Sequence, residues 1–321
     1  MMEYTDPLYG TVTFSDLEQE VIENTALQRL KEIHQNGAAF LVNKRMKTTR
    51  YDHSLGVATL VKQFGCDEDE VIAALVHDVS HTAFSHLADQ LFERKDQTYH
   101  EDFHERFVTD HGLDTLVKDH GYDPTYIFDE DNFTVLERDR PDICADRLDY
   151  MLRDLYTYGL LQPTHAEQII ENLTVTDGTI VAEDIETAKT VAERFIQLNE
   201  EVFFDPEHEA ANLLLKEILQ QAMDEGILTT EDLFKTDEHV LETLRGSSLA
   251  ADLEAIGPGI SVEPDADGEY TMYRKHRYVD PPVHETGKRL TDLDDEAAQM
   301  IEDFKDRVPT EPSFSITVPT N

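Results

Sequence analysis

The chain has 321 residues, enough for one large domain or two ordinary ones. It carries 68 acidic and 27 basic residues, a formal net charge of −41, which disfavours stable binding to nucleic acid and to anionic membranes. Because the acidic residues are spread along the whole chain, we interpret the charge as adaptation to a salty cytosol in which repulsion is screened. An ordinary acidic protein is the alternative.

The cysteine content and the N-terminus exclude other classes of protein. Cys66 and Cys144 show no paired spacing, which argues against a disulfide scaffold and against a thiolate zinc site. No apolar run is long enough to cross a membrane, and the first residues lack the basic and apolar regions of a signal peptide. We therefore expect a soluble, cytoplasmic protein.

Helices are predicted throughout the first half of the chain. Ser15 and Glu18 have the spacing of a capping box, and the apolar pattern that follows predicts a helix as far as Gly37. Three further helices are predicted, over residues 52–65, from Asp67 through Val76, and over residues 141–158.

The second half mixes helices with short strands. Residues 173–181 alternate around Asp177 and Gly178, which predicts a hairpin, and long helices are predicted over 184–202 and 206–225. Residues 257–267 are rich in Gly, Pro and Asp, and 268–274 and 314–318 alternate like strands. We expect a mostly helical catalytic domain over residues 1–160 and a mixed extension over 161–321 that packs on it.

Histidines gather in one segment. His77, His81 and His86 follow the apolar run 71–76, and Asp78 follows His77 directly. His77 and His81 would share a helix face if the helix continues that far. A donor pair on a buried helix suits a metal site, because rigid support fixes the ligand geometry. A chance cluster of histidines is the weaker alternative.

Two more segments carry candidate ligands. His53 lies at the start of the second predicted helix, and Asp142, Asp146 and Asp149 share one face of the fourth, so spacing does not choose among these carboxylates. Imidazole and carboxylate donors together suit one divalent cation such as manganese, iron, magnesium, nickel or zinc. Such an ion activates water and polarises a phosphorus centre.

Cations are dense just before His53. Lys44, Arg45, Lys47 and Arg50 lie within seven residues. We interpret them as an electropositive entrance that attracts an anionic substrate. For the three residues from Lys44 to Lys47, an ordinary solvated loop is the equal alternative.

These residues carry a resemblance to a known family. His53, His77, Asp78 and Asp146 match the H…HD…D pattern of the HD-domain superfamily of metal-dependent phosphohydrolases. The order of further motifs is similar to that of the deoxynucleoside triphosphate triphosphohydrolases; these are residues 6–10, 27–33, 49–57, 77–86 and 146–150. The resemblance implies a mostly α fold, an HD-domain helical bundle followed by a mixed α/β C-terminal extension with short hairpins.

The resemblance also implies a role for each matching residue. The metal ligands would be His53, His77, Asp78 and Asp146, which selects Asp146 from the three candidate aspartates. His86, supported by Asp89, resembles the catalytic pair beside the scissile bond, His81 would contact phosphate, and His100 matches a further active-site histidine. The residues that match substrate-binding positions are Arg50 and Arg147 at the phosphates, Tyr150 and Asp154 at the sugar, and Gln35 at the 3′-hydroxyl.

The second half departs from that family. Ser80 replaces the usual glycine, Pro206 lies near the position of a family tyrosine, and Glu209 stands where a cation is expected. Only Arg194 is available for a further phosphate-binding arginine. The basic run from Arg274 to Arg277 either compensates by reaching a phosphate or a partner subunit, or merely balances local acidity.

The expected function is therefore hydrolysis of deoxynucleoside triphosphates to deoxynucleoside and triphosphate. One alternative keeps the metal but acts as a nucleotide phosphomonoesterase or phosphodiesterase. Another, of a different class, is a non-catalytic regulator that binds a nucleotide. The resemblance also implies a homo-oligomer.

Overall fold

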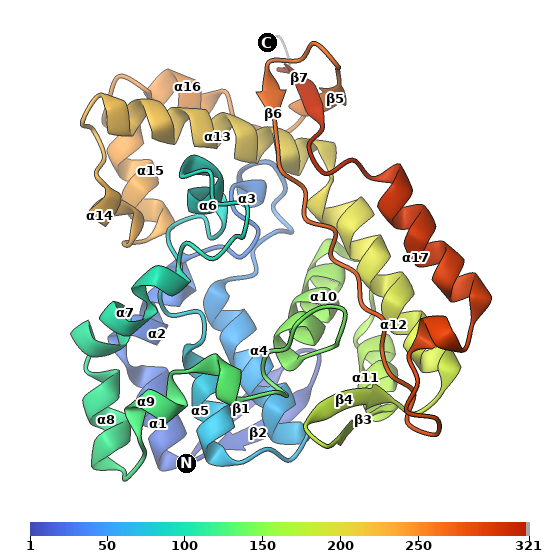
Figure 1. Cartoon of the computed structure of the whole chain (residues 1–321). Helices are drawn as coiled ribbons and strands as arrows, with labels where there is room; N and C mark the ends of the chain where they lie inside the picture. Colours follow the sequence, from blue (N-terminus) through green and yellow to red (C-terminus); the bar gives the residue numbers. More distant parts are fainter. Residues whose placement is uncertain (319–321) are drawn as a thin grey trace.

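The structure is a computed structural model that describes residues 1–318. Its helices and strands, labelled in Figure 1, confirm a mostly α fold with small antiparallel sheets. The helices are α1 (Asp16–Glu23), α2 (Thr25–Arg29), α3 (Ala39–Val42), α4 (Arg50–Gln63), α5 (Glu68–Val76), α6 (Leu87–Leu91), α7 (His104–Asp110), α8 (Leu113–Asp119), α9 (Pro124–Ile127), α10 (Ala145–Tyr158), α11 (Pro163–Glu171), α12 (Ile185–Leu198), α13 (Pro206–Asp224), α14 (Thr230–Leu233), α15 (Asp237–Arg245), α16 (Ala250–Glu254) and α17 (Asp295–Arg307). The strands are β1 (Met2–Asp6), β2 (Gly10–Phe14), β3 (Leu173–Thr176), β4 (Thr179–Ala182), β5 (Ser261–Pro264), β6 (Tyr270–Thr271) and β7 (Ser313–Thr317).

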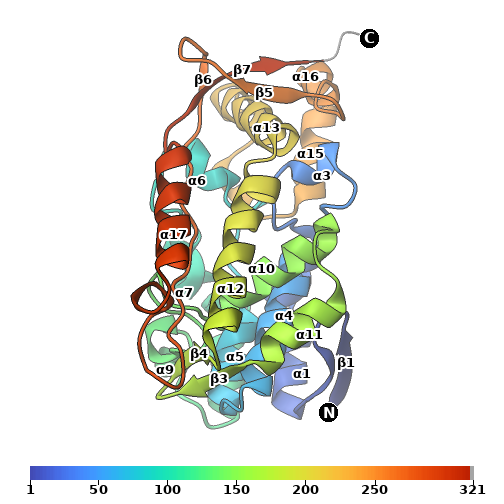
Figure 2. The same ribbon diagram turned by 90° about the vertical axis from the view of Figure 1, so that its right-hand side faces the viewer.

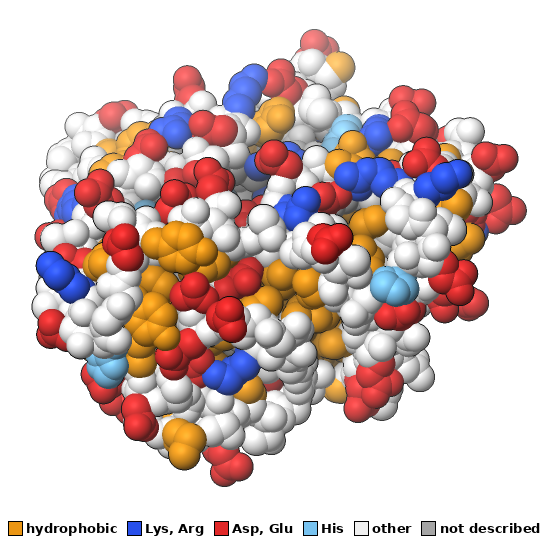
Figure 3. Space-filling view, turned by 60° about the horizontal axis from the view of Figure 1, so that its bottom comes forward, with side chains coloured by type: hydrophobic (Ala, Val, Ile, Leu, Met, Phe, Trp, Pro, Cys, Tyr) orange, Lys and Arg blue, Asp and Glu red, His pale blue; other side chains and the backbone are white. Residues whose placement is uncertain are grey.

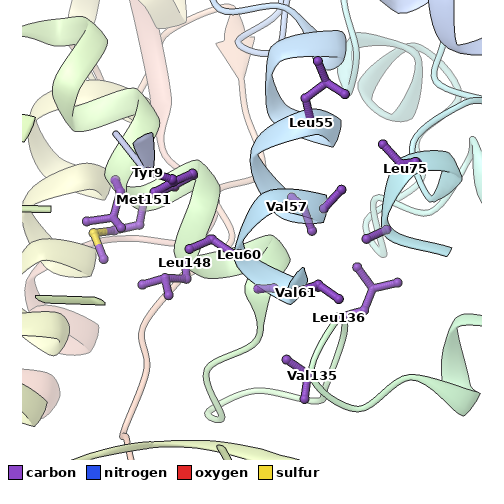
Figure 4. Close-up of a cluster of buried hydrophobic side chains, with 14 of the residues drawn as sticks. Tyr9, Leu55, Val57, Leu60, Val61, Leu75, Val135, Leu136, Leu148 and Met151 are labelled. Atoms are coloured by element: carbon purple, nitrogen blue, oxygen red, sulfur yellow. The ribbon is translucent and has the colours of Figure 1, made fainter. Parts of the chain in front are cut away.

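Three helices form the centre of the molecule. α4 is buried along most of its length, and it packs against α5 on one side and α10 on the other. Figure 4 shows Leu55, Val57, Leu60 and Val61 of α4 among apolar side chains of these neighbours, including Leu75. A helix that is buried nearly all round places its few polar side chains inside the protein. His53 is one of them, so the apolar packing of α4 fixes its position.

Gly56 allows α4 and α10 to approach closely. A Cβ atom at this position would lie 2.1 Å from Oδ1 of Asp149 and 2.0 Å from Nη2 of Arg153. Both partners are buried side chains of α10, and they form an ion pair with each other at 2.8 Å. The glycine therefore makes room for a charged pair that lies directly behind His53.

The second half of the chain packs against α10 and around α13. α12 lies beside α10, and α17 lies beside α12, with Ile196 and Ile301 in one apolar cluster (Figure 2). β5, β7 and β6 form a sheet in that order, and the predicted hairpin forms as β3 and β4. The main apolar core includes residues on both sides of residue 160, and the domain boundary placed there stays a prediction.

Several element boundaries differ from the sequence-based expectation. The helix predicted from Ser15 to Gly37 breaks at Asn24, whose side chain accepts a hydrogen bond from the backbone of Ala26 and caps a second helix. α10 begins at Ala145, because Cys144 is its extended N-cap residue. The N-terminal hairpin of β1 and β2 was not predicted, and residues 268–274 form a strand only over Tyr270–Thr271.

The excess of acidic over basic residues in the sequence, 68 to 27, is also visible at the surface. Figure 3 shows Asp and Glu spread over the face it displays, with fewer Lys and Arg among them. Over residues 1–318, no helix combines the length and the apolar character that crossing a bilayer requires.

Candidate metal centre and active site

Four predicted ligands converge between the three central helices. His53 comes from α4, His77 and Asp78 directly follow α5, and Asp146 lies in the first turn of α10. The Nε2 atom of His53 lies 2.9 Å from Oδ1 of Asp146 and 3.3 Å from Nε2 of His77. These three residues form one cluster of possible ligand atoms. Asp78 borders it, with one oxygen 3.6 Å from His77 Nε2 and the other 3.7 Å from His53 Nε2.

Hydrogen bonds behind the cluster orient both imidazoles. His53 Nδ1 donates to Oδ2 of Asp149 at 2.7 Å, and His77 Nδ1 donates to the carbonyl oxygen of Ala74 at 2.8 Å. Because Nδ1 donates in each ring, Nε2 is the nitrogen that faces the cluster, where it can either carry a proton or bind a cation through its lone pair. Two imidazole nitrogens and a carboxylate this close together need a positive charge between them, which either a proton on His53 or a metal ion can supply. This arrangement therefore fits a metal ion.

The pKa values show the same electrostatic preference. Burial lowers the pKa of His53, but the carboxylates of Asp146 and Asp149 outweigh burial and raise it to about 10. Burial raises the pKa of Asp78, but Arg50, His77 and His81 outweigh it and hold that pKa well below its usual range. The centre of the cluster thus stabilises positive charge surrounded by carboxylates.

The spacing of the donors suits a first-row or similar divalent ion. Two ligand atoms at about 2.1 Å from one ion lie about 3.0 Å apart at a right angle and about 3.4 Å apart at the tetrahedral angle. The distances between the imidazole nitrogens and carboxylate oxygens here, 2.9 to 3.7 Å, cover that range. Nitrogen and oxygen donors alone leave the identity of the ion open among those predicted.

The helix α5 ends at Val76, so His77 and His81 do not share a helix face as the sequence had suggested. A turn that follows α5 instead brings His81 to Asp78. His81 Nε2 donates to Oδ1 of Asp78 at 3.1 Å, and its ring stacks on that of His100 with 3.7 Å between centroids. The Nδ1 atoms of His81 and His100 are buried, and neither has a hydrogen-bond partner in the described part of the chain.

The predicted His86–Asp89 pair is present. His86 Nδ1 donates to Oδ2 of Asp89 at 3.0 Å, and Oδ1 of Asp89 accepts the backbone amide of Tyr99 at 2.9 Å. The carboxylate is buried and held from both sides, so it fixes the ring of His86 and leaves Nε2 available. The ring lies edge-on to His81, with 5.0 Å between centroids.

The loop that carries His86 is strained and held by groups that the sequence did not reveal. Phe84 and Ser85 have φ angles of 58° and 53°, a conformation that costs non-glycine residues about 1–3 kcal/mol each. Buried Asp237 accepts the amide of Phe84 at 2.7 Å, and Ser85 Oγ accepts from Nε of Arg50 at 2.9 Å. Arg50 also donates to Asp78 at 2.9 Å, so it links the loop to the metal ligands.

One cavity of about 730 Å³ unites the metal cluster, the histidines and the predicted substrate-binding residues. Gln35, Arg50, Arg147, Tyr150 and Asp154 all line it. Oδ1 of Asp154 accepts from Asn36 at 2.9 Å, while its Oδ2 and the Oε1 atom of Gln35 are buried without partners in residues 1–318. Burial raises the pKa of Asp154 to about 6. These atoms are suited to meet polar groups of a ligand.

Charged residues of the cavity differ from expectation in two places. Lys44, Arg45 and Lys47 do not line it, so the predicted electropositive entrance reduces to Arg50. Arg45 instead donates to the carbonyl oxygen of Tyr158 at 3.1 Å. The guanidinium of Arg147 faces the cavity wall, where its Nη2 donates to Glu137 at 2.6 Å.

The late basic run does reach the cavity, within the same chain. Arg274, Lys275 and Arg277 line it. Nε of Arg274 donates to Oε1 of buried Glu209 at 2.6 Å, so a cation stands where the sequence had shown only an acid. Sequence analysis missed this pairing because the two residues are 65 positions apart and belong to no common motif.

Comparison with known proteins agrees with this geometry. A family profile of the HD domain matches residues 50–154, which include all four predicted ligands. The Bacillus subtilis protein YdhJ is 36% identical over 287 residues, 88% of each chain. The Cordyceps militaris metal-dependent phosphohydrolase cns2 is 28% identical over 295 residues, 88% of this chain and 85% of that one. The chain belongs to the HD-domain superfamily of metal-dependent phosphohydrolases.

Two other relatives set the scope of this assignment. The deoxynucleoside triphosphate triphosphohydrolase SAMHD1 of Danio rerio is 30% identical over 144 residues, which are 38% of this chain and 23% of the Danio rerio protein. A hypothetical protein from Aquifex aeolicus has the same fold, with a TM-score of 0.72 and 20% identity over 99% of this chain and 96% of that chain. The HD superfamily thus accounts for the hydrolase class and the metal dependence.

Proposed function

We propose that the protein hydrolyses deoxynucleoside triphosphates to deoxynucleoside and inorganic triphosphate, with one divalent cation held by His53, His77, Asp78 and Asp146. The supporting observation is that a single cavity joins this donor set to the His86–Asp89 pair and to several cations. The partial similarity to the Danio rerio triphosphohydrolase supports the choice of substrate.

The reaction breaks the bond between the α-phosphorus and the 5′-oxygen and forms a bond from that phosphorus to the oxygen of water, whose released proton passes to the solvent and balances the proton given to the 5′-oxygen. When bound, the cation supplies Lewis-acid activation of the phosphoryl group and of water. Arg50 stabilises the charge that develops on the phosphoryl oxygens. His86 donates a proton from Nε2 to the leaving 5′-oxygen, while Asp89 holds the ring and stabilises its protonated form.

The protonation of His86 depends on the substrate. Burial lowers its pKa, against the opposing effect of Asp89, so the free protein holds the ring mainly neutral at pH 7. A phosphate placed beside the ring adds negative charge and raises the pKa. The acid form therefore develops when the substrate binds.

The other end of the cavity receives the nucleoside. Gln35 Oε1 and Asp154 Oδ2 are buried acceptors without partners in residues 1–318, which suits the hydroxyl group of a deoxyribose. Tyr150 contacts the aromatic rings of Phe195 and Phe203, which fixes its position at the cavity wall. A bulky, fixed side chain beside the sugar would exclude a ribose 2′-hydroxyl.

A product assay tests the proposal. The purified protein is incubated at high salt with manganese and each deoxynucleoside triphosphate, and products are separated by chromatography. We expect inorganic triphosphate and deoxynucleoside in equal amounts, and loss of both with Asp78→Ala but not with Asp119→Ala on the exposed end of α8. Release of orthophosphate or pyrophosphate alone, with turnover of an aryl phosphate, would indicate the phosphomonoesterase or phosphodiesterase alternative. Nucleotide binding without turnover, retained in Asp78→Ala, would indicate the regulator.

We also propose that the protein is adapted to a salty cytosol and works as a homo-oligomer. The acidic surface of Figure 3 supports the first, because concentrated salt screens repulsion among carboxylates. The second rests on the resemblance to the triphosphohydrolases. Light scattering and thermal unfolding over a range of salt concentrations test both.

A further inference from the structure

A second group of charges in the cavity is not explained by the metal centre. Six Lys and Arg side chains line the cavity: Arg50, Arg140, Arg147, Arg274, Lys275 and Arg277. Three of them form ion pairs: Arg50 with Asp78, Arg147 with Glu137, and Arg274 with Glu209. The other three form no ion pair with any carboxylate of residues 1–318. In a chain of net charge −41, unpaired cations grouped in one cavity need an explanation.

Each of these three cations is held by a neutral partner. Arg140 Nη1 donates to the carbonyl oxygen of His276 at 2.8 Å, and Arg277 Nη2 donates to Oε1 of Gln97 at 2.7 Å. Lys275 Nζ donates to the carbonyl oxygen of Asp96 at 3.1 Å. Neutral acceptors orient the side chains, and the nearby carboxylates of Glu101 and Asp146 act on Lys275 and Arg277 without forming an ion pair with them.

The cations are also close enough to affect one another. Burial lowers the pKa of Lys275 to about 8, and the nearby charges of Arg277, Arg140 and Arg147 add to that effect. Burial likewise lowers the pKa of Arg277, and Arg140 contributes. Like charges held together destabilise a fold unless an anion joins them.

The backbone that carries Lys275 and Arg277 is held by side-chain hydrogen bonds and not by a helix or a strand. Residues 272–280 form neither helix nor strand, and Figure 1 shows the chain running from β6 past α12 towards β4. Buried Asn199 holds Arg277, because its Nδ2 donates to the Arg277 carbonyl oxygen at 2.6 Å and its Oδ1 accepts the Arg277 amide at 3.2 Å. Asn199 begins a single turn of π-helix, a feature that is frequent at functional sites.

We propose that Arg140, Lys275 and Arg277 form a binding site for the distal phosphates of a polyphosphate ester, and that residues 272–280 thereby set the preference for a triphosphate. The inference deepens the proposed function, on which it rests for the position of the α-phosphorus at the metal. An arginine fork and a lysine suit chains of phosphate oxygens, and the Phe203 ring, 5.1 Å from the Arg277 guanidinium, stabilises the cation without neutralising it.

Calorimetry of the binding of inorganic triphosphate to the manganese-loaded protein tests the site independently of catalysis. We expect Arg277→Ala and Lys275→Ala each to weaken this binding about tenfold, since each removes a charge-assisted contact. Arg277→Lys should recover part of the lost affinity. The affinity for orthophosphate, which is too short to span from the metal to these cations, should change less than about twofold in the alanine variants. Lys47→Ala, which removes an exposed charge outside the cavity, should leave binding unchanged. All titrations are made at one ionic strength, because salt screens these contacts.

The outcomes separate this inference from the proposed function. If deoxynucleoside triphosphates yield triphosphate but the Lys275→Ala, Arg277→Ala double variant keeps wild-type triphosphate affinity and KM, the distal site is refuted and the function stands. If no substrate yields triphosphate but the double variant loses triphosphate binding about a hundredfold, the site stands and the function fails. A wild-type protein that does not bind triphosphate refutes the site directly.

Discussion

Asp154 gives the sharpest test of the cavity, because its charge opposes folding. The side chain is 1% exposed, and one of its oxygens has no hydrogen-bond partner in residues 1–318. Burial raises its pKa from 3.8 to about 6, which corresponds to about 3 kcal/mol at about 1.4 kcal/mol per pKa unit. A pKa raised on folding contributes stability that is complete below the unfolded value and is lost as pH rises through about 6. At pH 8 the ionised carboxylate therefore destabilises the folded protein.

We predict that Asp154→Asn becomes more stable relative to the wild type as pH rises. The linkage relation gives a charge cost of about 3 kcal/mol at pH 8 and about 1.5 kcal/mol at pH 5. The unpaired amide of the variant costs something at both values, but the change of about 1.5 kcal/mol between them remains. Urea unfolding of the metal-free protein measures it, followed by far-UV circular dichroism because the chain has no tryptophan.

Asp119→Asn removes the same charge from an exposed position, so its effect on unfolding should not change by more than about 0.5 kcal/mol between the two pH values. A stability difference between Asp154→Asn and the wild type that is the same at pH 5 and pH 8 would refute the argument. We also expect Asp154→Asn to lose activity on deoxynucleotides. A buried carboxylate that destabilises the fold is typical of a residue that is needed for function.

Two further predictions concern the support behind the metal ligands. Asp149→Asn should weaken metal binding about 10- to 100-fold in calorimetry, because the carboxylate of Asp149 orients His53. Asp142→Asn, on the same predicted helix face, should leave the metal affinity unchanged, and equal losses of affinity in the two variants would contradict the assignment. Gly56→Ala should lower the free energy of unfolding by about 3 kcal/mol or more, because the added Cβ would displace the buried Asp149–Arg153 pair. Gly246→Ala, whose Cβ would lie 3.5 Å from its nearest neighbour, should keep a free energy of unfolding within about 0.5 kcal/mol of the wild-type value. Similar urea midpoints for both variants would show that α4 and α10 can separate at little cost.

The part of the site that the sequence predicted lies in contiguous motifs. His77 and Asp78 are adjacent, and His86 and Asp89 are one turn apart, so local geometry alone brings each pair together. The helices around them were also predictable, because apolar residues recur throughout residues 55–61 and 71–76, although α4 and α5 are buried on most sides and not along one face. Even here the detail differed: His81 meets Asp78 through a turn after α5, and not along a continued helix.

The choice among the aspartates of α10 shows why periodicity could not complete the site. Asp146 and Asp149 were correctly placed on one face, but they approach opposite nitrogens of the same imidazole, Nε2 and Nδ1 of His53. Asp142 precedes the helix and pairs with Arg138 at 3.1 Å. Which nitrogen a carboxylate meets depends on the crossing of α4 and α10, and this crossing depends on Gly56, whose role is visible only in three dimensions.

The placement of cations shows the same limit and explains how so acidic a protein can receive a phosphate ester. Density along the chain pointed first to Lys44, Arg45 and Lys47, yet the cavity takes its later cations from the run 274–277, for which reaching a phosphate was only one of two interpretations. Counted over the described residues, six Lys and Arg but only seven Asp and Glu line the cavity, against 27 and 68 in the whole chain. Salt screens the distant surface carboxylates over about 10 Å or less, whereas cations within the cavity act on the ligand directly. The local balance of charge in the cavity, rather than the net charge of the chain, therefore decides whether a phosphate ester can bind there.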